Sequence, residues 1–388
     1  MGGRLHDRAG TETTDPSRGG AALRPGSGAT PTWVARIGNF DSLRFWAALS
    51  VLWSHAFAIS SGNGHTQPLF RLSGGQTALG TVALAVFFII SGYLVTRSFE
   101  RSLSAWRYVK ARALRIMPGL AVCVALVGFV MGPLLTTLPL ADYFVSWGLW
   151  RYILKNGSLL GFSDFLPHVF GGNPMANVNS SLWTLQIEVY CYLLVLVLGV
   201  VGILRRWVTL GLYLGFIAYL AWQGHNSIWE DQRADLFTKF LAGAVMYQWQ
   251  VRLDGRVALA CAGGSLACLL TGGFWLAQHT LFAYVVIYVA LAPHIRLPNM
   301  ARYGDLSYGI YLYAWPMTQV AVLSLAEPVW ATAGAIATAL SLALAFLSWH
   351  LVEKVALAFK DRNIPVETAL VAWVRRRAAA ALGSGTQR

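Results

Sequence analysis

An arginine and a histidine lie within the first strongly apolar segment of the chain, residues 41–59. Arg44 and His55 are eleven positions apart, which places both on one face of a helix, ~16 Å apart along its axis. A neutral histidine can accept a proton from a hydroxyl group, and a guanidinium group binds anions. One interpretation is a polar track along the helix. The other is an arginine at lipid phosphates and a histidine that is hydrogen-bonded in the core.

A second group of basic residues precedes the third apolar segment. Arg112 and Arg115 have i, i+3 spacing, and Pro118 is expected at the start of the following membrane helix. Two guanidinium groups on one helix face suit a polyanionic ligand, with Arg107 and Lys110 as further basic residues nearby. Anchoring to lipid headgroups would explain the same residues, and the sequence alone leaves both interpretations open.

A carboxylate, Glu188, lies inside the apolar segment 182–204. A charged group in a membrane needs a partner, and the candidates are Arg44, His55 and Lys239. The sequence leaves two roles open for Glu188, a structural ion pair or the orientation of a catalytic group.

Other ionisable residues in or near the apolar segments are expected to matter less for chemistry. Lys239 and His279 lie near the ends of their segments and could reach water. Asp305 and His350 are expected to have mainly structural roles.

The composition is that of a membrane protein. Of the 388 residues, 56% are hydrophobic and only 12% are charged, with a formal net charge of +13. Soluble globular domains carry about a quarter of their residues as charges, and disordered, collagen-like and disulfide-rich chains also differ from this composition. The four cysteines lie in apolar runs without metal-ligand spacing, so no metal is expected.

Ten apolar segments approach the ~20 residues that a helix needs to cross a bilayer. The sequence therefore predicts an all-α integral membrane protein, a bundle of about ten transmembrane helices over residues 38–354. Residues 1–37 are expected to form a disordered basic tail, residues 355–388 a basic cytoplasmic tail, and residues 140–155 an interfacial or re-entrant helix. The predicted spans are 41–59, 78–96, 117–137, 182–204, 207–223, 235–251, 255–273, 274–292, 306–326 and 329–352.

The distribution of positive charge predicts the orientation. If the spans alternate from a cytoplasmic N-terminus, the inside loops hold most of the lysine and arginine residues, as the positive-inside rule requires. Both termini are therefore expected in the cytoplasm, and the multi-pass chain in the plasma membrane, the inner membrane of a bacterial cell. Because the charge lines one membrane face, the expected partner is the lipid bilayer and not nucleic acid.

A set of short motifs is more specific, in its order and spacing, than any single residue. Together these motifs resemble the membrane acyltransferase-3 family over roughly residues 38–354. The motifs are Arg44 and His55 with ten residues between them, FIISGYL (88–94), RALRIMP (112–118), NSSLWTL (179–185) followed by Glu188, FLAG (240–243), SYGIYL (307–312) and WHLVEK (349–354). Two positions depart from the family pattern, since Ala314 replaces a frequent histidine and Val355 replaces a proline.

The resemblance implies an O-acyltransferase. Such a protein would transfer an acyl group, expected to be acetyl, from acyl-CoA to a hydroxyl group of a carbohydrate acceptor at or across the membrane. The donor phosphates would bind Arg112 and Arg115, with Arg107 and Lys110 as helpers. No metal is implied.

The resemblance also implies roles for the three residues inside spans. The acyl-bearing arm of the donor would pass Arg44 and reach His55, which would act as the general base while Glu188 orients its ring. Direct transfer and a transient acyl-His55 both remain open. The alternative function is a proton-coupled secondary transporter or flippase of a sugar-linked substrate, which would also need ionisable residues within the membrane.

Overall fold

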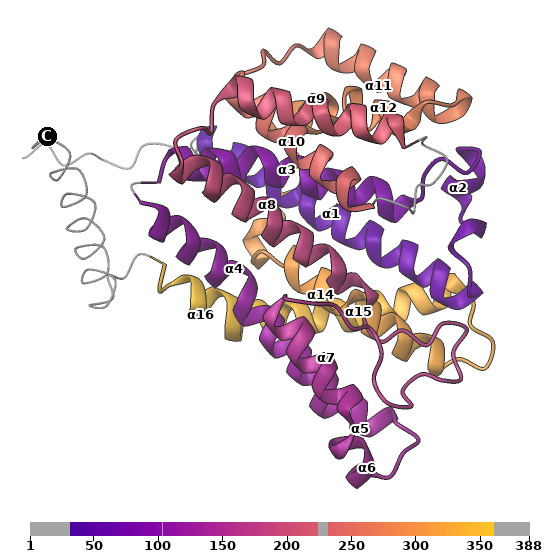
Figure 1. The fold of residues 1–388 in the computed structure, drawn as a ribbon. Coiled ribbons are helices and arrows are strands. Elements are labelled where there is room, and N and C mark those ends of the chain that lie inside the picture. Colours follow the sequence, from indigo (N-terminus) through magenta and orange to yellow (C-terminus); the bar gives the residue numbers. More distant parts are fainter. Residues whose placement is uncertain (1–31, 103, 224–231, 361–388) are drawn as a thin grey trace, which may run out of the picture.

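The computed structural model describes residues 32–102, 104–223 and 232–360, and every regular element within these ranges is a helix (Figure 1). The predicted all-α fold is therefore confirmed for the described part of the chain. The first helix, α1, begins at Thr32, inside the predicted N-terminal tail. The remainder of that tail, and residues 361–388 of the C-terminal tail, lie outside the described residues.

Each of the ten predicted spans coincides with helical structure. Short 3₁₀ or π-helical turns are marked η. The elements are α1 (Thr32–Ser61), η1 (Gly64–Thr66), α2 (Pro68–Leu72), α3 (Leu79–Glu100), α4 (Ala105–Leu126), η2 (Val127–Met131), α5 (Gly132–Leu135), α6 (Leu140–Val145), α7 (Trp147–Ser158), η3 (Ser180–Leu182), α8 (Trp183–Val200), α9 (Arg206–Trp222), α10 (Gln232–Gln248), α11 (Gly255–Thr271), α12 (Phe274–Ala277), α13 (Leu281–Leu291), η4 (Met300–Tyr303), α14 (Ser307–Leu323), α15 (Trp330–Ser348), η5 (Trp349–Glu353) and α16 (Lys354–Leu357).

Five helical stretches among the described residues are long and apolar enough to cross a membrane. The chain is therefore a membrane protein with several apolar helices, while the count of ten spans and the cytoplasmic termini stay predictions. The five stretches are Leu79–Glu100, Ala105–Leu135, Ser180–Val200, Phe274–Leu291 and Trp330–Leu357.

Helix α1 lies at the centre of the bundle and packs against α3, α14 and α15. Its residues Ala48, Leu52, Ala56 and Ile59 recur at helical spacing and are completely buried. Figure 1 shows α9, α11 and α12 on one side of α1 and α3, and α14 and α15 on the other. The neighbouring helices therefore cover the face of α1 that carries these four residues.

Two glycines allow α3 and α10 to approach closely. A Cβ on Gly92 would collide with the carbonyl oxygen of Phe240, and a Cβ on Gly243 would collide with the carbonyl oxygen of Ile89. Small residues let the backbones of membrane helices meet in this way. The FIISGYL and FLAG motifs therefore form one helix–helix contact.

Two prolines lie inside helices, which corrects the sequence interpretation. Pro118 was expected at the start of a helix but lies inside α4, and Pro316 lies inside α14. A proline lacks the N–H group that would bond the carbonyl four residues earlier. For Pro316 this carbonyl belongs to Leu312, and the side-chain amide of Asn179 donates to it at 3.0 Å.

The segment 140–155 forms two helices, α6 and α7, where one interfacial helix was predicted. Ser146 separates them, and its hydroxyl oxygen accepts a hydrogen bond from the backbone N–H of Gly148 and so caps α7. Leu149 and Tyr152 are buried on this side of the bundle, where α7 packs against α4 and η2. In Figure 1 the α5–α7 region projects away from the other helices.

Candidate active site

The first of two adjoining cavities, here called the arginine cavity, lies among α1, α3, α4, α8 and α14. Its volume is about 700 Å³, including the solvent space at its open side. Its lining residues come from positions 44 of α1, 84–91 of α3, 112–116 of α4, 184–192 of α8 and 307–311 of α14, so α3 and α8 contribute mainly their N-terminal halves. Its polar lining consists of Arg44, Ser91, Arg112, Arg115, Thr184, Glu188, Tyr192, Ser307, Tyr308 and Tyr311.

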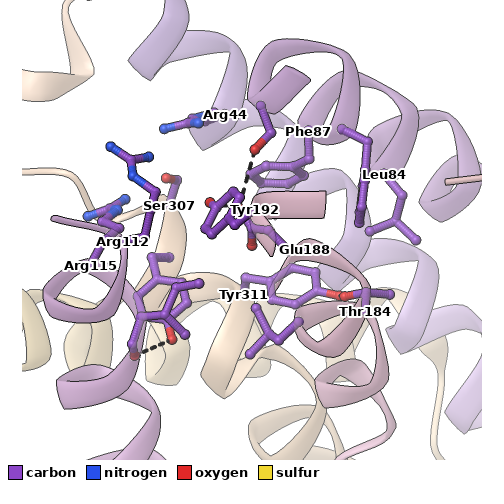
Figure 2. A pocket seen from close by; sticks show the side chains of 15 residues that line it. Arg44, Leu84, Phe87, Arg112, Arg115, Thr184, Glu188, Tyr192, Ser307 and Tyr311 are labelled. Atoms are coloured by element: carbon purple, nitrogen blue, oxygen red, sulfur yellow. Dashed lines mark hydrogen bonds between the residues drawn. The ribbon is translucent and has the colours of Figure 1, made fainter. Parts of the chain in front are cut away.

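Three arginines line this cavity, as Figure 2 shows, with Thr184 and Tyr311 on the opposite side. The expectation that Arg112 and Arg115 share a helix face is confirmed, and the fold adds Arg44 from α1 to them. Arg107 and Lys110 do not line the cavity. Arg107 is exposed and Lys110 is buried nearer the start of α4.

The Arg115 guanidinium is held by two carboxylates. It lies 2.5 Å from Asp305 and 3.7 Å from Glu353, and 5.6 Å over the ring of Tyr308. Burial raises the pKa of Asp305, but Arg115 and Arg44 outweigh burial and keep it below its ordinary value. The charge of Arg115 is therefore compensated within the protein, and the structural role expected for Asp305 is confirmed.

Arg44 and Arg112 carry the less compensated charges. In each, the Nε atom is buried and has no hydrogen-bond partner among the described residues. The Arg112 guanidinium lies 5.6 Å over the ring of Tyr192. Buried donors are normally satisfied, so these two groups are suited to an anionic ligand.

Glu188 lines the arginine cavity, one side chain away from the arginines. Its Oε1 atom accepts a short hydrogen bond from the Tyr192 hydroxyl group and a longer one, 3.4 Å, from Ser91. Ser91 and Tyr192 were not singled out from the sequence, although Tyr192 follows Glu188 at i, i+4 spacing.

The second cavity, here called the histidine cavity, is lined by His55 and has a volume of about 1260 Å³, including the solvent space at its open side. The His55 ring packs edge-on against Trp315, with the ring centroids 4.7 Å apart. Its Nδ1 atom is buried and has no hydrogen-bond partner within the described ranges of the chain. The other polar and aromatic lining residues include Ser54, Gln67, Thr81, Asn177, Ser180, Ser181, Trp183, Gln232 and Asp235.

The structure does not place Glu188 beside His55. The prediction that this carboxylate orients the histidine ring is therefore wrong. The two residues lie in different cavities, and the hydrogen bonds of Glu188 go to Tyr192 and Ser91. Arg44 and His55 do lie on one face of α1, as predicted, since both side chains face the interior of the bundle. They line two adjoining cavities, Arg44 the first and His55 the second.

A buried ion cluster lies against the histidine cavity and was missed in the sequence. Lys239 is completely buried with its Nζ atom 2.5 Å from Asp235, and His279 is 3.0 Å from the other oxygen of Asp235. Lys239 is therefore not a partner of Glu188, and neither Lys239 nor His279 reaches water as expected. The i, i+4 spacing of Asp235 and Lys239 was the available signal.

Within the described residues, no group of three or more His, Cys, Asp or Glu side chains is placed to hold a metal ion. The chemistry of the two cavities is that of guanidinium, imidazole, carboxylate, hydroxyl and amide groups. An anion can be bound in one cavity and a proton accepted in the other.

A sequence model described as an acyltransferase domain matches residues 37–350 of this chain. The chain is similar to an O-acetyl transferase of Shigella phage Sf6, with 30% identity over 342 residues, which is 84% of this chain and 97% of that protein. It is also similar to nodulation protein 10 of Rhizobium leguminosarum bv. viciae, with 28% identity over 366 residues, 83% of this chain and 94% of that protein. No solved structure matches significantly.

Proposed function

This chain belongs to the membrane acyltransferase-3 family and is an O-acyltransferase, and from this premise we propose that it transfers an acetyl group from acetyl-CoA to a carbohydrate hydroxyl group. The donor would occupy the arginine cavity and the acceptor the histidine cavity. The observation that carries this assignment is that Arg44 and His55, on one helix, line two adjoining cavities of different chemistry.

The arginine cavity fits the phosphates of acyl-CoA. Arg44 and Arg112 offer buried Nε–H groups that have no hydrogen-bond partner in the part of the chain that the structure describes. A phosphate oxygen would satisfy these donors through charge-assisted hydrogen bonds. Arg115, fixed by Asp305 and Glu353, would form the wall beside them, and Arg107 and the buried Lys110 remain proposed helpers near the start of α4.

The histidine cavity fits a polyhydroxylated acceptor. Trp183 and Trp315 supply flat apolar surfaces, while Gln67 and Asn177 supply amide groups that can bond sugar hydroxyls. The cavity is open on one side, so an acceptor could enter it from outside the helix bundle.

His55 would act as the general base. Its neutral imidazole would take the proton of the acceptor hydroxyl as the oxygen attacks the thioester carbonyl. When the carbonyl re-forms, the C–S bond breaks, and the proton on His55 passes to the departing thiolate. A transient acyl-His55 is the second route, and acyl label on the protein without acceptor would identify it.

Glu188 has a proposed role on the donor side. Its carboxylate, which accepts from Tyr192, would hold this ring under the Arg112 guanidinium. The sequence assigned Glu188 to catalysis, and we now propose that it acts by positioning Arg112.

The proposed orientation places the arginine cavity on the cytoplasmic side of the plasma membrane. The three arginines of this cavity, Arg44 of α1 and Arg112 and Arg115 of α4, lie in the helix halves that the positive-inside rule assigns to the cytoplasm. Acyl-CoA made in the cytoplasm would then enter directly. Both termini would lie on the same side as the donor.

A transfer assay tests the proposal. Purified protein in lipid vesicles, supplied with radiolabelled acetyl-CoA and an oligosaccharide acceptor, is expected to form labelled ester. His55→Ala should lower turnover by about a thousandfold, since a general base contributes about 10²–10⁴-fold. A transporter would be indifferent to the thioester.

His65 provides the matched control. It is an exposed histidine that lines neither cavity. His65→Ala should keep wild-type turnover, and equal turnover of folded His55→Ala and wild-type protein would rule out the assigned base.

A further inference from the structure

Three side chains line both cavities. They are Leu84 of α3, Thr184 of α8 and Tyr311 of α14. The arginine cavity and the histidine cavity therefore meet at a single layer of side chains, here called the dividing layer. If the donor phosphates bind Arg44 and Arg112, the acyl thioester must cross this layer to reach His55.

Hydrogen bonds hold two side chains of the dividing layer, Tyr311 and Thr184, in place. The Tyr311 hydroxyl group donates to the Ser181 carbonyl at 3.0 Å and makes a short contact with the Thr184 hydroxyl group. Thr184 itself lies 3.2 Å from the same carbonyl. Tyr311 is 7% exposed and Thr184 3% exposed, so the layer is compact.

The Tyr311 ring is the largest side chain of this layer. Phe87, which lines the arginine cavity only, packs edge-on against it with the centroids 6.0 Å apart. A change of the Tyr311 rotamer would exchange its hydrogen bonds and open a path beside Leu84. The width of the path would depend on the ring and not on the hydroxyl group.

We propose that Tyr311 is a specificity-determining residue, which admits thin, unbranched acyl groups to His55 and excludes branched ones. This inference rests on the proposed function, because it assumes a donor in the arginine cavity. In acetyl-CoA the acetyl group is at the end of the pantetheine arm, so it would reach the dividing layer first, and its cross-section is small. An isobutyryl group carries a branch next to the carbonyl and would collide with the ring.

Acyl-donor selectivity tests the inference. Tyr311→Ala should raise the ratio of isobutyryl to acetyl transfer by about tenfold or more, the discrimination that a few methyl groups provide in a protein site. Tyr311→Phe, which keeps the ring, should leave this ratio unchanged. Tyr308→Phe is the matched control, since Tyr308 lies on the same helix and lines the arginine cavity only.

A labelling experiment separates this inference from the proposed function. Thr81 lines the histidine cavity only. In a variant without the native cysteines, Thr81→Cys is exposed to a membrane-impermeant maleimide from the side of the arginine cavity. Adding Tyr311→Ala should increase labelling, whereas Tyr311→Phe should change it less.

Leu84→Ala enlarges the same layer without loss of a hydrogen bond and serves if Tyr311→Ala does not fold. Increased labelling without any acyl transfer would support the conclusion that Tyr311 lies between the two cavities. The same result would reject the proposed function. Unchanged labelling and an unchanged donor ratio in a folded Tyr311→Ala or Leu84→Ala protein would overturn the inference.

Discussion

The two cavities differ in how their charges are compensated. In the arginine cavity, Arg115 is paired with carboxylates while Arg44 and Arg112 keep unpartnered N–H groups. In the histidine cavity, the carboxylate of Asp235 is paired with the buried Lys239, and most of the lining is neutral. One cavity is therefore suited to an anion and the other to a neutral hydroxylated molecule. Each cavity also has one ion pair in its wall, Arg115–Asp305 in the arginine cavity and Lys239–Asp235 in the histidine cavity.

The largest expected effect is on the paired arginine. Arg115→Ala would leave the carboxylates of Asp305 and Glu353 without their partner. Removing one member of a buried ion pair costs about 3–5 kcal/mol, so the unfolding temperature in detergent should fall markedly. Arg107→Ala, at an exposed position of the same helix, should change it little.

The same pair predicts a pH dependence. The pKa of Asp305 is lowered in the folded protein, so its contribution is present at neutral pH and is lost as the pH falls through the lowered value. Arg115→Ala should weaken this acid-side loss of stability. An identical acid-side profile in both proteins would contradict the assigned pair.

The next effect concerns the ion pair of the histidine cavity. Asp235→Asn would leave Lys239 charged and buried, at a cost of about 3 kcal/mol in the free energy of unfolding. Adding Lys239→Met should restore most of that stability, because a buried pair is often replaceable by apolar residues. Thermal unfolding of the single and double variants measures this coupling, and purely additive losses would argue against it.

The unpartnered arginine should affect donor binding more than stability. Arg112→Ala removes a charge-assisted interaction of about 2 kcal/mol, so the Kd for acetyl-CoA should rise about thirtyfold. The unfolding temperature should change far less than in Arg115→Ala. Isothermal titration with acetyl-CoA measures the first quantity, and an unchanged Kd would remove Arg112 from the donor site.

The smallest predicted effect is on the support of Glu188. Tyr192→Phe deletes the hydroxyl group that donates to this carboxylate but keeps the ring under Arg112. A loss of about 1 kcal/mol should raise the donor Kd about fivefold and leave the acceptor KM unchanged. A change in acceptor KM alone would assign Glu188 to the other cavity.

The sequence predicted the helical fold, the interior face of α1 and the convergence of Arg112 and Arg115. These features depend on the 3.6-residue period and on the high cost of exposing ionisable groups to lipid. It did not predict that Arg115 pairs with Asp305, since 190 residues separate them in the chain. The sequence also did not predict the partners of Glu188, which are Tyr192 on the same helix and Ser91 on α3, because spacing along the chain does not rank such candidates.

The amino-acid sequence by itself determined that this chain is a helical membrane protein with a guanidinium and an imidazole on one helix face, because hydropathy and helical period are local properties. Only the tertiary structure decided that these two groups line different cavities and that Tyr311 lies between the cavities. It also decided which of the charges are compensated. Packing of α3, α8 and α14 around α1 makes these contacts, and such contacts depend on which helices become neighbours.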